Sequence, residues 1–242
     1  MMPPAVVPLH RRIARLLLGL SALVPLPGLL AAPHDTMLPI YSLFVAAVFL
    51  RRPIEAAAER VRLPRGLAFG LLVLASGLLT ETLAWLSSYL ARAPEPALLH
   101  PQLAYDLLLS PVVYGGWALA WPLLMRRWRF SLAEVFVIQG LYGILLEQDG
   151  AIFRQGLAAM PWGLVLWAYV FLVYGAAIGL AYLPFERAYA GEGRRRGWIR
   201  LPIALGATLL ATVVSSLAWM AVLHLLGITI PDPRPIVEAP LW

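Results

Sequence analysis

The chain has 242 residues, of which 61% are hydrophobic and only 13% are charged. A soluble domain has about 45–50% apolar and about 25% charged residues, so this composition excludes a soluble globular protein and also a disordered one. The net charge of +6 comes from 19 arginines that lie in short clusters between apolar runs. This pattern is typical of the loops of an integral membrane protein rather than of a nucleic-acid-binding surface.

Seven segments are apolar enough to be membrane helices, which need about 20 such residues. The predicted spans are 13–32, 36–50, 67–91, 106–125, 131–153, 158–184 and 201–229. We therefore predict an all-α, polytopic bundle of seven transmembrane helices, in which residues 1–242 form a single transmembrane domain. The first segment also has the charged start and apolar middle of a signal peptide, which is the alternative to a retained helix.

The arginine distribution predicts the orientation. Sixteen arginines lie before or at the start of the first span, or in the loops after the second, fourth and sixth spans. The three exceptions are Arg92, Arg154 and Arg234. The positive-inside rule places the sixteen in the cytoplasm, so the N-terminus is expected inside and the C-terminus outside, in a multi-pass protein of a prokaryotic inner membrane. Glu134 is expected to form an inner-surface ion pair with Arg127 or Arg129.

Three segments between or after the spans have distinctive patterns. Residues 51–66 place charged and apolar residues at helical spacing, which predicts an amphipathic helix on the inner surface, where arginine meets anionic lipid. Docking of this segment to a cytoplasmic partner is the alternative. Residues 93–101 and 231–242 are rich in proline and predict an ordered outer loop and an extended outer tail.

Cysteine, lysine and asparagine are absent from the sequence. Without cysteine there is no disulfide or thiolate site, and without lysine there is no Schiff base, which excludes a seven-helix retinal protein. Four scattered histidines and no HExxH motif predict no metal site, and no cofactor is indicated. The scarcity of cysteine and asparagine suits a thermophile, with codon bias as the alternative explanation.

Two glutamates stand out inside predicted spans and away from the arginine clusters, where an ionisable side chain is a functional candidate by default. Glu81 lies in the third span and Glu147 in the outer half of the fifth. Each follows a glycine by four residues, Gly77 and Gly143, on the same helix face. The glycines leave room beneath each carboxyl for another helix to approach. Since both helices run in one direction and both glutamates lie past the middle, the two carboxyls can meet and share a proton.

Aromatic and polar residues at similar depth predict a pocket that opens outward, with the two glutamates at its base. The expected wall and binding residues are Trp85, Asp106, Trp117, Gln148, Trp167, Tyr174, Trp219 and His224. Core packing is the alternative for the tryptophans, and a water-facing boundary position is the alternative for Asp106.

Carboxyls beside aromatic faces suit a hydrophobic substrate that becomes positively charged during reaction, because π faces attract cations. In size, span number and use of acidic residues the chain resembles the small seven-helix membrane-bound terpene cyclases. This resemblance covers gross features and no motif, and it implies an enzyme that acts on a lipid or isoprenoid by carboxylate acid–base catalysis.

Two other functions are alternatives: a proton- or cation-coupled transporter of small solutes, and a non-catalytic subunit of a larger membrane complex. The expected partners are membrane lipids, a hydrophobic small molecule and, for the subunit, another membrane protein. Nucleic acid is not an expected partner.

Overall fold

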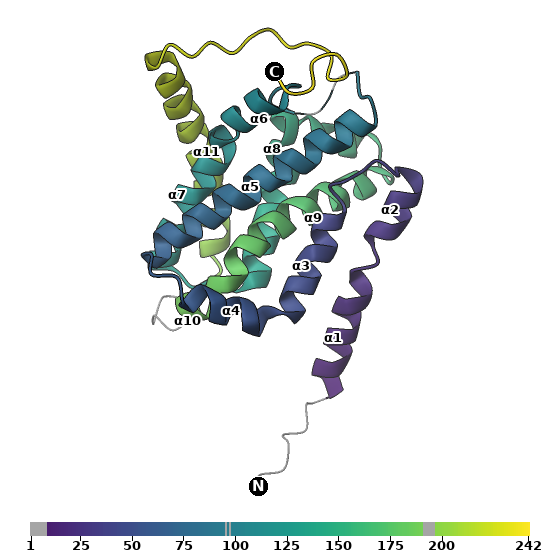
Figure 1. Ribbon diagram of the computed structural model, residues 1–242. Helices are drawn as coiled ribbons and strands as arrows, with labels where there is room; N and C mark the ends of the chain where they lie inside the picture. Colours follow the sequence, from purple (N-terminus) through teal and green to yellow (C-terminus); the bar gives the residue numbers. More distant parts are fainter. Residues whose placement is uncertain (1–8, 95, 97, 191–196) are drawn as a thin grey trace.

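The computed structural model describes residues 9–94, 96, 98–190 and 197–242, and these ranges form helices without a β-strand (Figure 1). The helices are α1 (Leu9–Ser21), α2 (Pro25–Ala31), α3 (Pro39–Phe49), α4 (Arg51–Glu59), α5 (Arg65–Leu90), α6 (Leu103–Leu109), α7 (Pro111–Arg127), α8 (Leu132–Ala158), α9 (Gly163–Tyr182), the 3-10 turn η1 (Leu183–Phe185), α10 (Glu186–Ala190) and α11 (Arg200–Leu225). Proline occupies the first turn of α2, α3 and α7, where its missing N–H costs no helical hydrogen bond.

Within the described ranges, four helical segments are long and apolar enough to cross a membrane. They are Arg65–Leu90, Leu103–Arg127, Gly163–Tyr189 and Arg200–Leu225. These segments coincide with the third, fourth, sixth and seventh predicted spans. They support the predicted class, an α-helical membrane protein.

The other three predicted spans differ from continuous membrane helices. Residues 13–32 form two short helices, α1 and α2, on either side of a turn. Helix α3 has 11 residues, and at 1.5 Å per residue it is about 16 Å long, which is shorter than the hydrocarbon core of about 30 Å. Helix α8 has 27 residues, but its backbone leaves helical geometry at residues 147–150.

The core of the bundle lies between α5, α7, α8, α9 and α11. Its largest buried side chains include Trp117, Trp121 and Tyr142, each at most 1% exposed. Trp121 Nε1 donates to Gln139 Oε1 at 3.0 Å, and Gln139 is itself fully buried. The indole N–H of α7 thus satisfies the side-chain oxygen of a buried glutamine from α8, while Gln139 Nε2 has no hydrogen-bond partner among the described residues.

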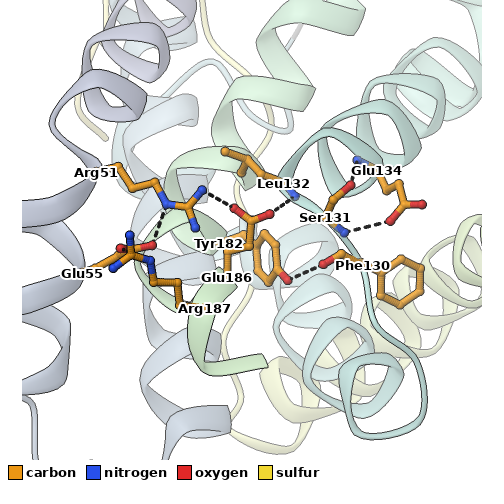
Figure 2. A network of polar contacts seen from close by, with 9 residues as sticks. All are labelled: Arg51, Glu55, Phe130, Ser131, Leu132, Glu134, Tyr182, Glu186 and Arg187. Atoms are coloured by element: carbon orange, nitrogen blue, oxygen red, sulfur yellow. Dashed lines mark hydrogen bonds and ion pairs between the residues drawn. The ribbon is translucent and has the colours of Figure 1, made fainter. Parts of the chain in front are cut away.

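At the arginine-rich end, α4 is bound to the bundle by ion pairs (Figure 2). Arg51 contacts Glu55 at 2.6 Å and Glu186 at 2.9 Å, and Arg187 contacts Glu55 at 2.9 Å. Burial opposes the charge on Arg51, but the hydrogen bond to Glu55 and the charge of Glu186 outweigh it and raise the pKa of Arg51. Glu55 is only 3% exposed, so α4 is docked on protein rather than only resting on lipid.

The predicted pairing of Glu134 with Arg127 or Arg129 is wrong, because Glu134 binds Arg200 at the start of α11. Glu134 also completes a capping box that begins α8: its carboxylate accepts from the Ser131 amide at 2.8 Å, and Ser131 Oγ accepts from the Glu134 amide (Figure 2). The helix start and the ion pair therefore share one side chain. The guanidinium of Arg200, which binds Glu134, is 66 residues away along the chain. A local sequence pattern could therefore not predict this pair.

Replacing Glu186 by alanine is expected to destabilise this end of the bundle. Glu186 accepts from the Leu132 amide at 2.9 Å and also binds Arg51, so its loss leaves a backbone donor without its acceptor and removes one of the two carboxylates that bind the Arg51 guanidinium. Such a loss costs about 1–3 kcal/mol. Thermal unfolding in detergent should show a lower midpoint for Glu186→Ala and a smaller decrease for Glu186→Gln, which can still accept from Leu132. Equal midpoints for the wild type and Glu186→Ala would contradict this role.

Candidate functional site

A cavity of about 780 Å³ lies in the half of the bundle opposite the arginine-rich end, and both Glu81 and Glu147 line it. Its walls come from α5, α7, α8, α9 and α11 and from the loop between α5 and α6. Most of its lining is apolar, with hydroxyl groups contributed by Thr80, Thr212 and Ser216. A concave, mainly apolar space with a few convergent polar groups is the usual form of a small-molecule site.

The carboxyl of Glu81 is held by a tyrosine from a different helix. Tyr114 on α7 donates its phenol hydrogen to Glu81 Oε1 at 2.7 Å. The ring of Tyr114 lies directly against Gly77 on α5, where a Cβ atom would be only 2.2 Å from the ring. Glycine at this position therefore admits the tyrosine that orients the glutamate one helical turn later.

Glu147 has the same arrangement on the other side of the cavity. Tyr174 on α9 donates its phenol hydrogen to Glu147 Oε2. A Cβ atom on Gly143 would lie 2.6 Å from the ring of Tyr174. The two Gly–Glu segments that stand out in the sequence thus each hold a Tyr–Glu hydrogen bond at one cavity.

Trp117 lies between the two tyrosines and fixes their rings. Its centroid is 4.9 Å from that of Tyr114 and 5.7 Å from that of Tyr174, both edge to face. Tyr142 packs edge to face on the same indole at 5.1 Å, and its hydroxyl is 2.7 Å from that of Thr212. This buried aromatic cluster holds both glutamates in place from behind, since locked rotamers make a site precise.

The backbone of α8 is interrupted where it reaches the cavity. Glu147 is extended (φ −55°, ψ 129°), and Gln148, Asp149 and Gly150 follow with φ of 51°, 54° and 76°. A left-handed conformation at a residue other than glycine costs on the order of 1 kcal/mol and is common at functional sites. Arg154 Nη1 donates to the carbonyl of Asp149 at 3.2 Å and so links the interruption to the helical part that follows it. The interruption separates α8 into two helical parts at Glu147.

The loop between α5 and α6 covers one side of the cavity, and the C-terminal tail holds this loop in place. Leu98 and Leu99 line it, and the next residues of the loop are tied to the tail, which runs from α11 across the bundle to α6 (Figure 1). Gln102 donates to the carbonyls of Arg234 and Ala239 at 2.9 and 2.8 Å, and it is 1% exposed. The predicted extended tail is thus a strap held by side-chain and backbone hydrogen bonds.

Removing the amide of Gln102 is expected to release this strap. Gln102→Leu keeps the size of the side chain but leaves two tail carbonyls without donors, so the tail should open more often. Hydrogen–deuterium exchange of peptides from residues 231–242 should become faster than in the wild type, while exchange in α9 stays unchanged. Unchanged exchange in the tail would show that Gln102 does not hold it.

Asp106 is buried in α6 rather than at a water-facing boundary, since it is fully enclosed by protein. Its Oδ1 accepts from the amide of His100 at 3.1 Å. Its Oδ2 has no hydrogen-bond partner among the described residues. Asp106 does not line the cavity, so we assign it to the anchoring of the His100 loop.

Four of the predicted site residues line the cavity: Glu81, Glu147, Gln148 and Tyr174. The tryptophans lie outside it. Trp85 stacks on Tyr89 and donates to the carbonyl of Pro101, and Trp167 stacks on Phe153 and donates to that of Ile152.

The remaining residues predicted to form the cavity wall lie outside the cavity. Trp219 donates to the carbonyl of Leu108 at 2.8 Å, and Trp117 lies behind the tyrosines. His224 is exposed near the end of α11. The aromatic wall of the cavity therefore consists of tyrosines, of which the sequence pattern indicated only Tyr174; Tyr114 and Tyr142 were missed.

Within the described ranges, no group of three or more His, Cys, Asp or Glu side chains is arranged to hold a metal ion. No protein-family model, curated protein or solved structure matches the chain.

Proposed function

We propose that the protein is a membrane enzyme that acts on a lipid or isoprenoid substrate by acid–base catalysis at Glu81 and Glu147. The observation that carries the proposal is the arrival of these two carboxyls, from α5 and α8, at one cavity, each with a tyrosine donor. Two carboxyls in different surroundings can take opposite roles, one as acid and one as base.

The proposed chemistry needs no other reactant. The neutral carboxyl of one glutamate protonates a carbon–carbon double bond and leaves a carbocation on the substrate. The ionised carboxylate of the other removes a proton from a neighbouring carbon, and a new double bond forms. One proton enters and one leaves, so the product is an isomer of the substrate. The π faces of the tyrosines that line the cavity would stabilise the cation.

The proposed topology supplies the setting for this chemistry. It has seven spans in a multi-pass protein of a prokaryotic inner membrane, with the N-terminus cytoplasmic and the C-terminal strap outside. In this topology α8 is the fifth span, and the cavity lies in its outer half. The ion-paired arginine-rich end would face the cytoplasm, in agreement with the positive-inside rule.

Deuterium transfer tests the proposal whatever product the enzyme forms. The purified protein in nanodiscs is incubated in D₂O with linear polyprenyl alcohols of increasing length, and the recovered lipid is washed with water and analysed by mass spectrometry. Acid–base catalysis at carbon places carbon-bound deuterium in at least one lipid, and Glu81→Gln abolishes it. Absence of carbon-bound deuterium throughout the panel, or equal incorporation by Glu81→Gln, would overturn the proposal.

A proton-coupled transporter is the second candidate, and the interruption of α8 favours it. Broken helices at membrane depth occur where the backbone lines a cavity and binds a substrate or ion, and an intramembrane glutamate can carry the coupled proton. This function predicts solute-dependent proton movement in proteoliposomes that Glu147→Gln abolishes. Proton movement without deuterium transfer would favour the transporter over the enzyme.

A further inference from the structure

Two residues of α11 line the cavity and yet are largely exposed. Val213 and Leu217 contribute to the cavity wall, and 53% and 70% of their surfaces are accessible from outside the protein. A side chain that faces both a cavity and the exterior marks an opening between them. The cavity is therefore open along this face of α11.

This opening lies at the depth of the bilayer. Helix α11 is one of the helices apolar enough to span a membrane, and it ends at Leu225. At 1.5 Å per residue, Leu217 and Val213 lie about 12 and 18 Å below that end. A hydrocarbon core is about 30 Å thick, so both side chains meet lipid chains rather than water.

The seam between α8 and α11 explains why the opening is there. Glu134 and Arg200 join the two helices at the arginine-rich end, and Tyr142 and Thr212 join them at mid-height by a 2.7 Å hydrogen bond. Past Tyr142, α8 leaves helical geometry at Glu147. The residues of α11 that follow Thr212 on this side are the exposed Val213 and Leu217. The seam between α8 and α11 therefore opens beyond the hydrogen bond between Tyr142 and Thr212.

The loop side of the same cavity is only partly covered, since Leu99 lines the cavity and is 41% exposed, less than Val213 or Leu217. The loop that carries Leu98 and Leu99 is anchored to the C-terminal strap through Gln102. Gln148 and Asp149, at the interruption of α8, line the cavity and are also exposed. The opening thus has polar groups at the α8 interruption and apolar groups along α11, the pattern that an amphipathic chain would match.

We infer that the substrate enters laterally from the bilayer between α8 and α11, and that it is a linear amphipathic lipid. Its polar end lies by Gln148 and Asp149, and its apolar chain passes Leu217 on the way to the two glutamates. This inference rests on the proposed function for the chemistry, but it concerns the route and the substrate class.

A steric wedge tests the route. The probe is a C20 polyprenyl alcohol with a photoreactive diazirine, added to the protein in nanodiscs, and cross-linking to the cavity peptides of α5 and α8 is measured by mass spectrometry. Leu217→Trp should reduce this cross-linking to background, and Leu217→Ala should retain it. Leu210→Trp is the matched control, because Leu210 is 65% exposed on the same helix and does not line the cavity.

Each alternative outcome contradicts the inference. Equal cross-linking of Leu217→Trp and the wild type would show that the substrate enters elsewhere. An equal decrease in Leu217→Trp and Leu210→Trp would show that any tryptophan on α11 lowers cross-linking, whether or not it lines the cavity. A decrease in Leu99→Trp alone, at the loop that covers the cavity, would indicate entry from the aqueous side, and a wild type without cavity cross-links would exclude the substrate class. Cross-linking does not require turnover, so it tests the route separately from the chemistry. If Leu217→Trp blocks labelling of the cavity but the wild type transfers no deuterium, the route is supported and the acid–base function is rejected.

Discussion

Glutamine at position 81 or 147 is expected to lower deuterium transfer to a substrate by about 10²- to 10⁴-fold, the range that general acid–base catalysis contributes. Glutamine keeps the size and the hydrogen-bond acceptor of each side chain, so Tyr114 and Tyr174 retain their bonds. What is lost is the ability to give or take a proton. The rates are measured by mass spectrometry under the conditions of the wild-type assay.

The double variant distinguishes a catalytic pair from two independent groups. Residues that act as one unit are non-additive, so Glu81→Gln/Glu147→Gln should be no slower than the slower single variant. Glu59→Gln is the matched control, since Glu59 is exposed on α4 and far along the chain from the cavity residues. Losses that multiply in the double variant would contradict a shared proton cycle, and full activity in either single variant would exclude that residue from it.

The spacing of glycine and glutamate predicted more of the site than composition did. The sequence indicated that Gly77 and Gly143 leave room beneath Glu81 and Glu147, and the structure places a tyrosine ring on each glycine. It did not indicate which rings these are. Tyr114 follows Glu81 by 33 residues and Tyr174 follows Glu147 by 27, so the pairing depends on how whole helices pack.

Three of the four tryptophans predicted as cavity walls lie outside the cavity for a physical reason. A buried indole N–H needs an acceptor, and Trp85, Trp167 and Trp219 find backbone carbonyls at helix ends and in neighbouring segments. This need anchors them in the packing between elements. A tyrosine can instead donate to a carboxyl inside a mainly apolar cavity, as Tyr114 and Tyr174 do, so the aromatic residues beside the two glutamates are tyrosines.

The interruption of α8 had a sequence signal that the apolar pattern obscured. Asp149-Gly150 is a dipeptide typical of turns, because both residues tolerate left-handed backbone conformations. It stands inside a segment apolar enough to predict a continuous span at 131–153. Hydropathy reports whether a segment suits the membrane and not whether its backbone stays helical, so the break at the cavity required the structure.

A methyl group at position 77 is expected to damage both stability and function. In Gly77→Ala the new Cβ would lie 2.2 Å from the ring of Tyr114, a side chain only 2% exposed that also packs against Trp117 at 4.9 Å. Overpacking of this kind typically costs about 1–3 kcal/mol. Any shift of Tyr114 also lengthens its 2.7 Å bond to Glu81, so deuterium transfer should fall along with the unfolding midpoint.

Gly206→Ala provides the matched control for a glycine-to-alanine change in a long apolar helix. No atom lies within 4 Å of a Cβ at position 206 in α11, so the substitution meets no clash. Alanine is the better helix former by up to about 1 kcal/mol, and this variant should be as stable as the wild type or more stable. In the Gly77→Ala background, Tyr114→Leu should recover part of the stability but not the activity, because it removes the ring and its hydroxyl together. If Gly77→Ala unfolded at the same temperature as Gly206→Ala and retained full activity, the close contact between α5 and Tyr114 would not position Glu81.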